Sequence, residues 1–337
     1  MNRKQVLSIG IVICGAVLIL AILWALGNLT GGTALAAGYT AGDAEITGQV
    51  KNLDLQWTSG RIVFTTHSGS TIRLQETCSK PLAEDEKMQW LLDGDTLRVR
   101  YERPAFRPFS FGKEKVLTVT LPEGLALTDA LISATSAGVE IPALQAQQLK
   151  LDVTSGDITA AAVAEQVDVS STSGDITLTL NGTVKDLKAS ATSGNVGLTA
   201  ADVQRVQVTT TSGGIGLTAA KAGDVSLHST SGSVYARVAE AGSIRLGSTS
   251  GGIRVLTERF DTLSSDSTSG SVRAFLPAAP GFKADLHTTS GRVTCTLPLT
   301  RDGSAYVCGD GSARVDIGTT SGDITVMDAA DPAALTD

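Results

Sequence analysis

The residues that could do chemistry recur at fixed places in a repeat. Three aspartates directly follow a Thr-Ser-Gly tripeptide, at Asp157, Asp175 and Asp323. A calcium stack needs carboxylate oxygens on adjacent repeats, and only Asp157 and Asp175 belong to neighbouring repeats. The other repeats carry Asn, Gly, Ser or Arg at this position, so we interpret it as a turn that favours polar residues. The sequence predicts no metal ion and no cofactor.

Two histidines occupy one phase of the repeat. His228 and His287 each stand two positions before the Thr of the tripeptide, three repeats apart. If repeats stack at about 4.8 Å, the two residues lie about 14 Å from each other. That separation is too large for a shared metal ion, and we expect both imidazoles to be solvated at the surface.

Four arginines could form a basic strip on this acidic chain. Arg254 and Arg273 share a phase in adjacent repeats, and Arg245 and Arg292 lie nearby in the sequence. A row of guanidinium groups could bind an anionic cell-wall or surface polysaccharide through paired contacts. The competing interpretation is scattered charge that keeps the protein soluble, and the sequence favours it.

Two cysteines, Cys295 and Cys308, flank a longer loop in which Asp302-Gly303 predicts a hairpin turn. In an exported protein a disulfide between them could staple this loop. Cys295 also falls at an inward apolar phase, where a buried free thiol is common. Both interpretations stay open.

The element that must position these residues is the repeat itself. Most intervals between copies of Thr-Ser-Gly are 18 to 21 residues, and the last is 31; the copies begin at Thr154, Thr172, Thr192, Thr211, Thr230, Thr249, Thr268, Thr289 and Thr320. Apolar residues alternate with polar ones on both sides of the tripeptide. The pattern predicts an all-β fold, a parallel β-solenoid of about 19-residue coils over residues 129–327. A flat antiparallel sandwich is the alternative.

The segment before the repeats, residues 43–128, is less regular. It carries the pattern once, around Thr58-Ser59-Gly60, and a hairpin signal at Asp93-Gly94. We interpret it as a β-rich cap that closes the first coil, because a solenoid must cover its open apolar ends. Residues 328–337 are expected to form a tail.

The composition of the chain argues against some classes of function. There are 27 Lys+Arg against 34 Asp+Glu, for a net charge of −7, and only 4% aromatic residues. A strongly basic nucleic-acid binder is therefore excluded. Enzymes that act on glycans within β-helices need clustered carboxylates, and no stacked position here offers two acids beside an aromatic platform. We expect no catalytic residues, and a glycan-active enzyme is the least favoured alternative.

The amino terminus predicts a membrane segment. Residues 6–28 are almost entirely apolar and follow Arg3 and Lys4, which indicates one transmembrane helix behind a cytoplasmic stub of residues 1–5. The bulk of the chain would then be extracytoplasmic, joined to the lipid bilayer by a flexible stalk at residues 29–42. A cleaved secretory signal ending near Ala36 is the alternative.

Four segments resemble a family of bacterial envelope proteins, the DUF4097 family, also labelled adhesins. They are TSGRIVF near the start, LAEDEKMQWLLDGDTLRVRY, KVLTVTLPEG, and the final GDGSARVDIGTTSGDITV, and the resemblance covers residues 43–327. It implies a stacked β-solenoid behind an N-terminal membrane segment and carries over no catalytic residues. We therefore expect a structural, adhesive or envelope-stress role with an envelope protein or surface polymer as partner, or a binding module for anionic polysaccharide.

Overall fold

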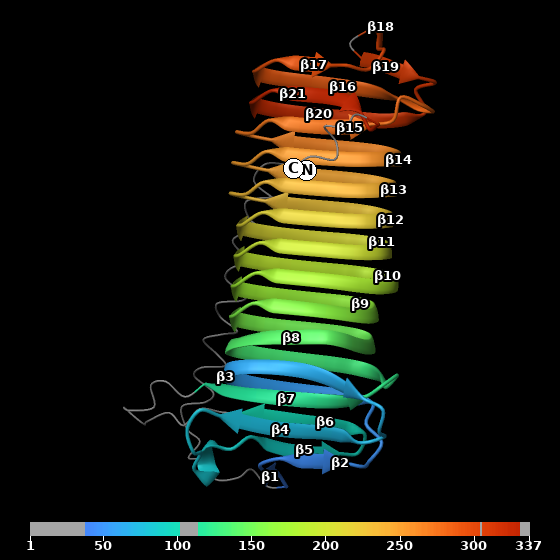
Figure 1. Cartoon of the computed structure of the whole chain (residues 1–337). Coiled ribbons are helices and arrows are strands. Elements are labelled where there is room, and N and C mark those ends of the chain that lie inside the picture. Colours follow the sequence, from blue (N-terminus) through green and yellow to red (C-terminus); the bar gives the residue numbers. More distant parts are fainter. Residues whose placement is uncertain (1–37, 102–113, 304, 331–337) are drawn as a thin grey trace.

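The chain winds into one tall column of stacked strands (Figure 1). A computed structural model describes residues 38–101, 114–303 and 305–330. The regular part of the column consists of seven strands that follow one another along the chain: β8 (Ala126–Ser155), β9 (Ile158–Ser173), β10 (Ile176–Ser193), β11 (Val196–Ser212), β12 (Ile215–Ser229), β13 (Val234–Ser248) and β14 (Ile253–Ser267).

Neighbouring strands of this part are parallel and in register. Ile176 of β10 faces Val196 of β11, which faces Ile215 of β12, and Ile215 faces Val234 of β13. Equivalent repeat positions therefore lie directly over one another, as the period predicts. The parallel β-solenoid is confirmed, and the antiparallel sandwich is wrong.

The core is a continuous stack of aliphatic side chains inside the coils. Leu178, Leu198 and Leu217 occupy one inward position in three successive coils, and each is at most 3% exposed. Because side chains alternate across a strand, each coil contributes one apolar row inward and one polar row outward. The outward rows are therefore the surface on which any function must be built.

The Thr-Ser-Gly corner is set by close contact between coils. A Cβ at Gly213 would lie 1.9 Å from the carbonyl oxygen of Gly194 in the preceding coil, so only glycine fits. One residue before the tripeptide, the Ser229 hydroxyl donates to the Gly213 carbonyl at 2.9 Å. The equivalent Ser248 hydroxyl donates to the Gly232 carbonyl at 3.0 Å. These bonds satisfy buried carbonyls at the corner and tie each coil to the one before it.

The N-terminal end of the column does not stack in chain order. Its strands are β1 (Thr40–Ala41), β2 (Ala44–Ile46), β3 (Asn52–His67), β4 (Ile72–Cys78), β5 (Gln89–Asp93), β6 (Thr96–Tyr101) and β7 (Lys115–Pro122). One side of β3 pairs with β6 and β7, and the other side pairs with β8. The coil of β3 is thus inserted between β7 and β8, which are consecutive in the chain.

This end region is β-rich. It contains the antiparallel pairs β5–β6, β4–β7, β2–β4 and β1–β5, and the hairpin predicted at Asp93-Gly94 joins β5 to β6. A 3-10 helix at Glu84–Glu86 precedes β5. Among the described residues, the first strand begins at Thr40, inside the segment that is predicted to form the stalk.

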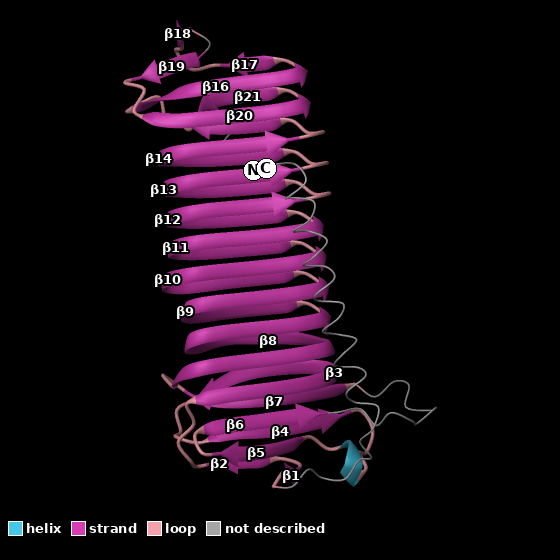
Figure 2. Ribbon diagram, turned by 180° about the vertical axis from the view of Figure 1, so that it is seen from behind, coloured by secondary structure: helices cyan, strands magenta, loops and turns pink. Residues whose placement is uncertain are grey.

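The C-terminal end is also out of order, which corrects the sequential stack expected from the sequence. Its strands are β15 (Val272–Leu276), β16 (Gly281–Ser290), β17 (Val293–Cys295), β18 (Thr300–Asp302), β19 (Ala305–Gly309), β20 (Ala313–Ser321) and β21 (Ile324–Asp328). β20 lies between β14 and β16, and β21 lies between β15 and β17. The last coil of the chain therefore fills a gap below the coil that precedes it, as Figure 2 shows from behind.

No helix among the described residues is long and apolar enough to cross a membrane. The predicted cytoplasmic stub and transmembrane helix, residues 1–28, lie outside the described residues, as does most of the predicted tail.

Candidate binding surface

Outward side chains form ladders along the column because the coils are in register. The ladder five residues after each motif Thr begins with Thr159 and Thr177, passes two glycines, and continues as Tyr235, Arg254 and Arg273. Arg254 of β14 directly faces Arg273 of β15. The neighbouring positions predicted for these two arginines are confirmed.

A second ladder runs beside the first, two residues further along each strand. It consists of Arg237, Leu256, Phe275 and Met327 on successive coils. Leu256 and Phe275 form a small apolar cluster separate from the main core, although their position faces outward. Phe275 is only 1% exposed.

Aromatic rings flank the central arginine. The Arg254 guanidinium carbon lies 5.9 Å from the centroid of the Tyr235 ring and 5.0 Å from that of the Phe275 ring. Both distances allow a cation–π attraction. The rings restrict how this side chain can move and hold its charge on the outer face of the column.

The two flanking arginines are exposed and form no ion pair within the part of the chain that the structure describes. This separates Arg237 and Arg273 from other cations of the coils, such as Lys185, which pairs with Glu165 at 2.5 Å. Arg259 likewise pairs with Glu240 at 3.5 Å. We call the group formed by Tyr235, Arg237, Arg254 and Arg273 the arginine surface.

The structure does not bring all four predicted arginines together. Arg245 lies on the second half of its coil, in register with Ser226 and Ser264. Arg292 lies in the turn after β16, where its backbone N–H donates to Asp323 Oδ1 at 2.8 Å. The single four-residue strip is therefore wrong, and only Arg254 and Arg273 share a ladder.

Sequence reasoning missed two members of the arginine surface, Tyr235 and Arg237. They stand five and seven residues after Thr230, at the phases of Arg254 and Leu256 in the next coil. Aligning every position after the tripeptide, rather than the arginines alone, would have found them.

The aspartates that follow the tripeptide bind backbone. Asp157 Oδ1 accepts the N–H of Asp175 at 2.9 Å, and Asp175 Oδ1 accepts the N–H of Asn195 at 2.7 Å. Each carboxylate thus bonds the turn of the next coil, which agrees with the turn interpretation. Among the described residues no group of three or more His, Cys, Asp or Glu side chains is placed to hold a metal ion.

The two histidines share a ladder, but four levels apart instead of three. From His228 the ladder runs through Gly247, Asp266 and Gly318 to His287. His228 covers Gly247, and its partial burial lowers its pKa. Burial and the Asp316 carboxylate raise the pKa of Asp266, and His287 opposes that shift.

The cysteines at the C-terminal end are free thiols in the structure. Cys308 is buried, and its Sγ lies 3.7 Å from the carbonyl oxygen of Ala278. Burial raises the pKa of Cys295 and of Cys308. The hairpin predicted at Asp302-Gly303 joins β18 to β19, and the disulfide across it stays a prediction.

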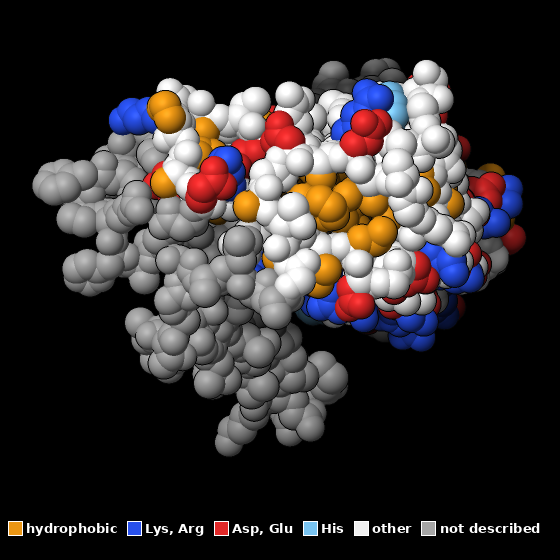
Figure 3. All heavy atoms as spheres, turned by 90° about the horizontal axis from the view of Figure 1, so that it is seen from below, with side chains coloured by type: hydrophobic (Ala, Val, Ile, Leu, Met, Phe, Trp, Pro, Cys, Tyr) orange, Lys and Arg blue, Asp and Glu red, His pale blue; other side chains and the backbone are white. Residues whose placement is uncertain are grey.

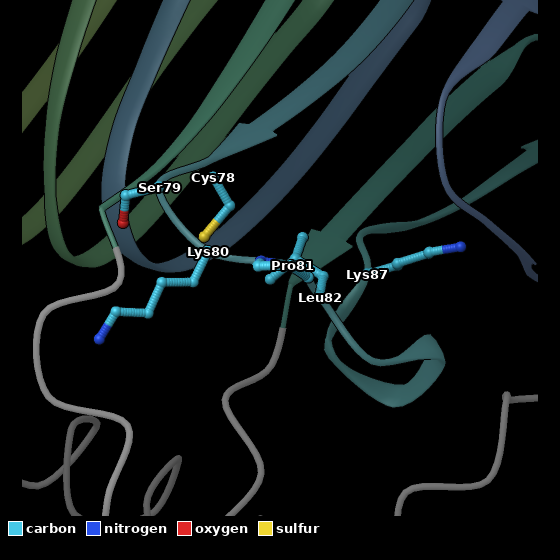
Figure 4. Close-up of a pocket in the computed structure, with 6 residues that line it drawn as sticks. All are labelled: Cys78, Ser79, Lys80, Pro81, Leu82 and Lys87. Carbon is cyan, nitrogen blue, oxygen red and sulfur yellow. The ribbon is translucent and has the colours of Figure 1, made fainter.

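A shallow hollow of about 400 Å³ lies near the N-terminal end (Figure 4). It is lined by Cys78, Ser79, Lys80, Pro81, Leu82 and Lys87. The side chains of Lys80 and Lys87 extend away from each other, so the hollow does not gather charged groups on one point. The arginine surface is the better candidate for binding.

The solved structures that match the chain include three bacterial proteins. A structure named "putative cell adhesion protein" from Clostridium sporogenes is 10% identical, with a TM-score of 0.22, and the match covers 86% of this chain and all of that one. A "putative adhesin" from Bacteroides fragilis is 13% identical, with a TM-score of 0.32, covering 87% and 98%. A "putative lipid binding protein" from Parabacteroides distasonis is 15% identical, with a TM-score of 0.37, covering 86% and 97%.

No curated protein matches the chain in sequence. The model of the family described as Toastrack DUF4097 matches residues 50–179 and 161–327. These two ranges span nearly all of the coils and the cap, well over half of the chain. The protein therefore belongs to the DUF4097 family.

Proposed function

We propose that this protein is a membrane-anchored, extracytoplasmic adhesive module that binds an anionic surface polymer and has no catalytic activity. The observation that carries the proposal is the arginine surface. It places three guanidinium groups on adjacent coils, and two of them, Arg237 and Arg273, are exposed without an ion pair among the described residues.

The spacing of the arginine surface suits a polymer. Successive coils repeat at about 4.8 Å, so the guanidinium groups of Arg254 and Arg273 can meet successive anionic groups of an extended chain. Arginine binds phosphate and carboxylate oxygens through two parallel hydrogen bonds. Tyr235, on the coil before that of Arg254, adds a flat aromatic face that can pack against a sugar ring.

The location is supported by the sequence. Residues 6–28 are long and apolar enough to span a bilayer, and the basic residues Arg3 and Lys4 before them favour a cytoplasmic amino terminus. The coils then lie outside the cytoplasmic membrane, where wall and surface polymers are found.

We propose the absence of catalysis because the aspartates at the corner form hydrogen bonds with the backbone. Along the corner of the coils, Asp157, Asp175 and Asp323 accept backbone N–H groups. A carboxylate committed to a backbone hydrogen bond is a poor general acid or base.

The test is retention of the full-length chain, in detergent, on immobilised poly(glycerol phosphate). We expect the wild type to bind and to elute with rising salt. The double variant R237E/R273E should lose at least tenfold in affinity, because two cationic contacts become repulsive.

The matched control is R205E/R245E. It makes the same change in net charge on the second half of the coils, away from the arginine surface. Unchanged binding by the control supports the proposal. Equal losses in both double variants would show that only net charge matters and would reject the arginine surface as the binding site.

A further inference from the structure

The N-terminal end of the column is incompletely covered by its last strands. β1 contributes two residues, which pair with Gln89 and Trp90, and β2 contributes three. Strands this short cannot cover the whole end of the core. Ala44, Trp90 and Leu92 pack against the core cluster and remain partly exposed.

Figure 3 views the molecule from this end and shows apolar side chains gathered near its centre, ringed by polar and charged atoms. Both signs of charge occur among the strands and turns of this end. Arg98 pairs with Asp93 at 3.4 Å, and Lys51 pairs with Asp95 at 3.5 Å. A solenoid normally ends in a repeat with a polar outer face, so an apolar centre here indicates that something other than water contacts it.

The described chain begins at this same end. Gly38 lies beside Leu91, and the Tyr39 ring lies 4.0 Å from the guanidinium carbon of Arg100. The predicted membrane span ends at residue 28, and the eleven residues 29–39 separate it from Thr40. A stretch of that length reaches at most about 40 Å when fully extended.

We infer that the N-terminal end of the column, through Ala44, Trp90 and Leu92, rests on the lipid bilayer. The inference depends on the membrane anchor of the proposed function, because the anchor keeps this end close to the lipid and makes a weak apolar contact effective. Tryptophan is well suited to such a place, since its ring prefers the boundary between acyl chains and headgroups.

A second copy of the chain is the other occupant that an apolar end could accept. Two columns that meet end to end at this face must point in opposite directions. Two copies anchored in one membrane point in the same direction, away from it. The anchor therefore favours lipid over a second copy.

The contact has a consequence for the arginine surface. The coil of β13 lies about nine levels above β5, which is about 40 Å at the spacing of stacked strands. A column that stands on its N-terminal end would hold Tyr235, Arg254 and Arg273 well clear of the headgroups, where they can reach a polymer in the envelope.

The experiment uses tryptophan fluorescence of the full-length chain in phosphatidylcholine vesicles, with and without brominated acyl chains. The chain has three tryptophans, Trp24, Trp57 and Trp90. The variant W24F removes the one in the predicted span and leaves Trp90 and Trp57, of which Trp57 is buried inside the coil of β3 at 2% exposure. The variant W24F/W90F is the control, with only Trp57 left.

We expect brominated lipid to quench W24F at least twofold more strongly than W24F/W90F. Flotation of the vesicles separates the possible failures. A chain that floats but shows equal quenching in both variants overturns the end contact and leaves the anchor intact. A chain that does not float overturns the anchor and the end contact together, and end-to-end cross-links between floating copies would assign the face to a second copy instead.

Discussion

Lys115 and Glu76 form an ion pair in which both side chains are almost completely buried, 2% and 3% exposed. The Lys115 ammonium also donates to the Glu86 carbonyl at 2.5 Å and lies 3.2 Å from the centroid of the Tyr101 ring. Glu76 accepts the N–H of Met88 at 3.0 Å. Burial lowers the pKa of Lys115 to about 7, while contact with the Glu76 carboxylate favours the charged ammonium. The pair therefore ties β4 and β7 to the segment that leads into β5.

Loss of one partner should unfold this end of the column easily. Glu76→Gln leaves the Lys115 ammonium buried without a carboxylate, and we expect a loss of about 3–5 kcal/mol in the free energy of unfolding. Urea denaturation measures it. Lys185→Gln is the control, because its ion pair with Glu165 is more than half exposed and should be worth no more than about 1 kcal/mol. Equal losses in the two variants would contradict this account.

The close contact at the Thr-Ser-Gly corner gives a second prediction. Gly213→Ala places a Cβ 1.9 Å from the Gly194 carbonyl oxygen, and the rigid backbone of two coils must separate to admit it. We expect a destabilisation of about 2–4 kcal/mol, measured by thermal or urea unfolding. In the same coil, Gly216→Ala meets nothing within 4 Å and should be neutral or slightly stabilising. A neutral Gly213→Ala would show that the corner is not tightly packed.

The regular coils could be predicted from the sequence because each coil contains the same local sequence pattern. The tripeptide marks the corner, and inward residues such as Val206 and Val208 recur at the same phase in every coil. In-register stacking then follows from matching identical patterns. The same phase placed Arg254 beside Arg273 correctly.

The order of the end coils could not be predicted, because the local signals at the two competing positions are the same. The coil of Thr320 can stack on the tripeptide at Thr268 or on that at Thr289, and both present the same corner. The choice is made by the hairpin of β18 and β19, whose second strand pairs antiparallel with β16. The spacing of the tripeptides does not indicate this pairing, because the two strands belong to different parts of the sequence.

The surface ladder of His228 predicts a pH dependence of stability. Burial against Gly247 lowers the folded-state pKa of His228 below the ordinary histidine value of about 6.5, so the unfolded chain binds more protons just below that pH. Stability should therefore fall as the pH drops through about 6.5. His228→Gln should lose less stability than the wild type between about pH 8 and about pH 5, as measured by urea midpoints.

A second variant checks the cause of that pH dependence. Gly247→Ala puts a Cβ 2.5 Å from His228 Nδ1, so the imidazole must move towards solvent. Exposure restores an ordinary pKa, and the variant should show the same flattened profile as His228→Gln. If Gly247→Ala keeps the wild-type profile, burial of the ring is not what lowers its pKa.

The exchanged order of the C-terminal coils can be tested by cross-linking. Ser321 donates its backbone N–H to the Thr268 carbonyl at 2.9 Å, which places Thr320 directly above Thr268. In a background with the native cysteines replaced by serine, T268C/T320C should form a disulfide under mild oxidation, since strands in contact are about 4.8 Å apart.

The control variant T268C/T289C should not form a disulfide, because a whole coil separates these positions by about 10 Å, beyond the reach of a disulfide. Peptide mapping without reductant identifies the bridge, and the opposite pattern would restore the sequential stack. The observed order has a mechanical meaning: the coil of β20 and β21 is held between two others, so the end of the chain cannot peel away until the coil of β16 and β17 above it has opened.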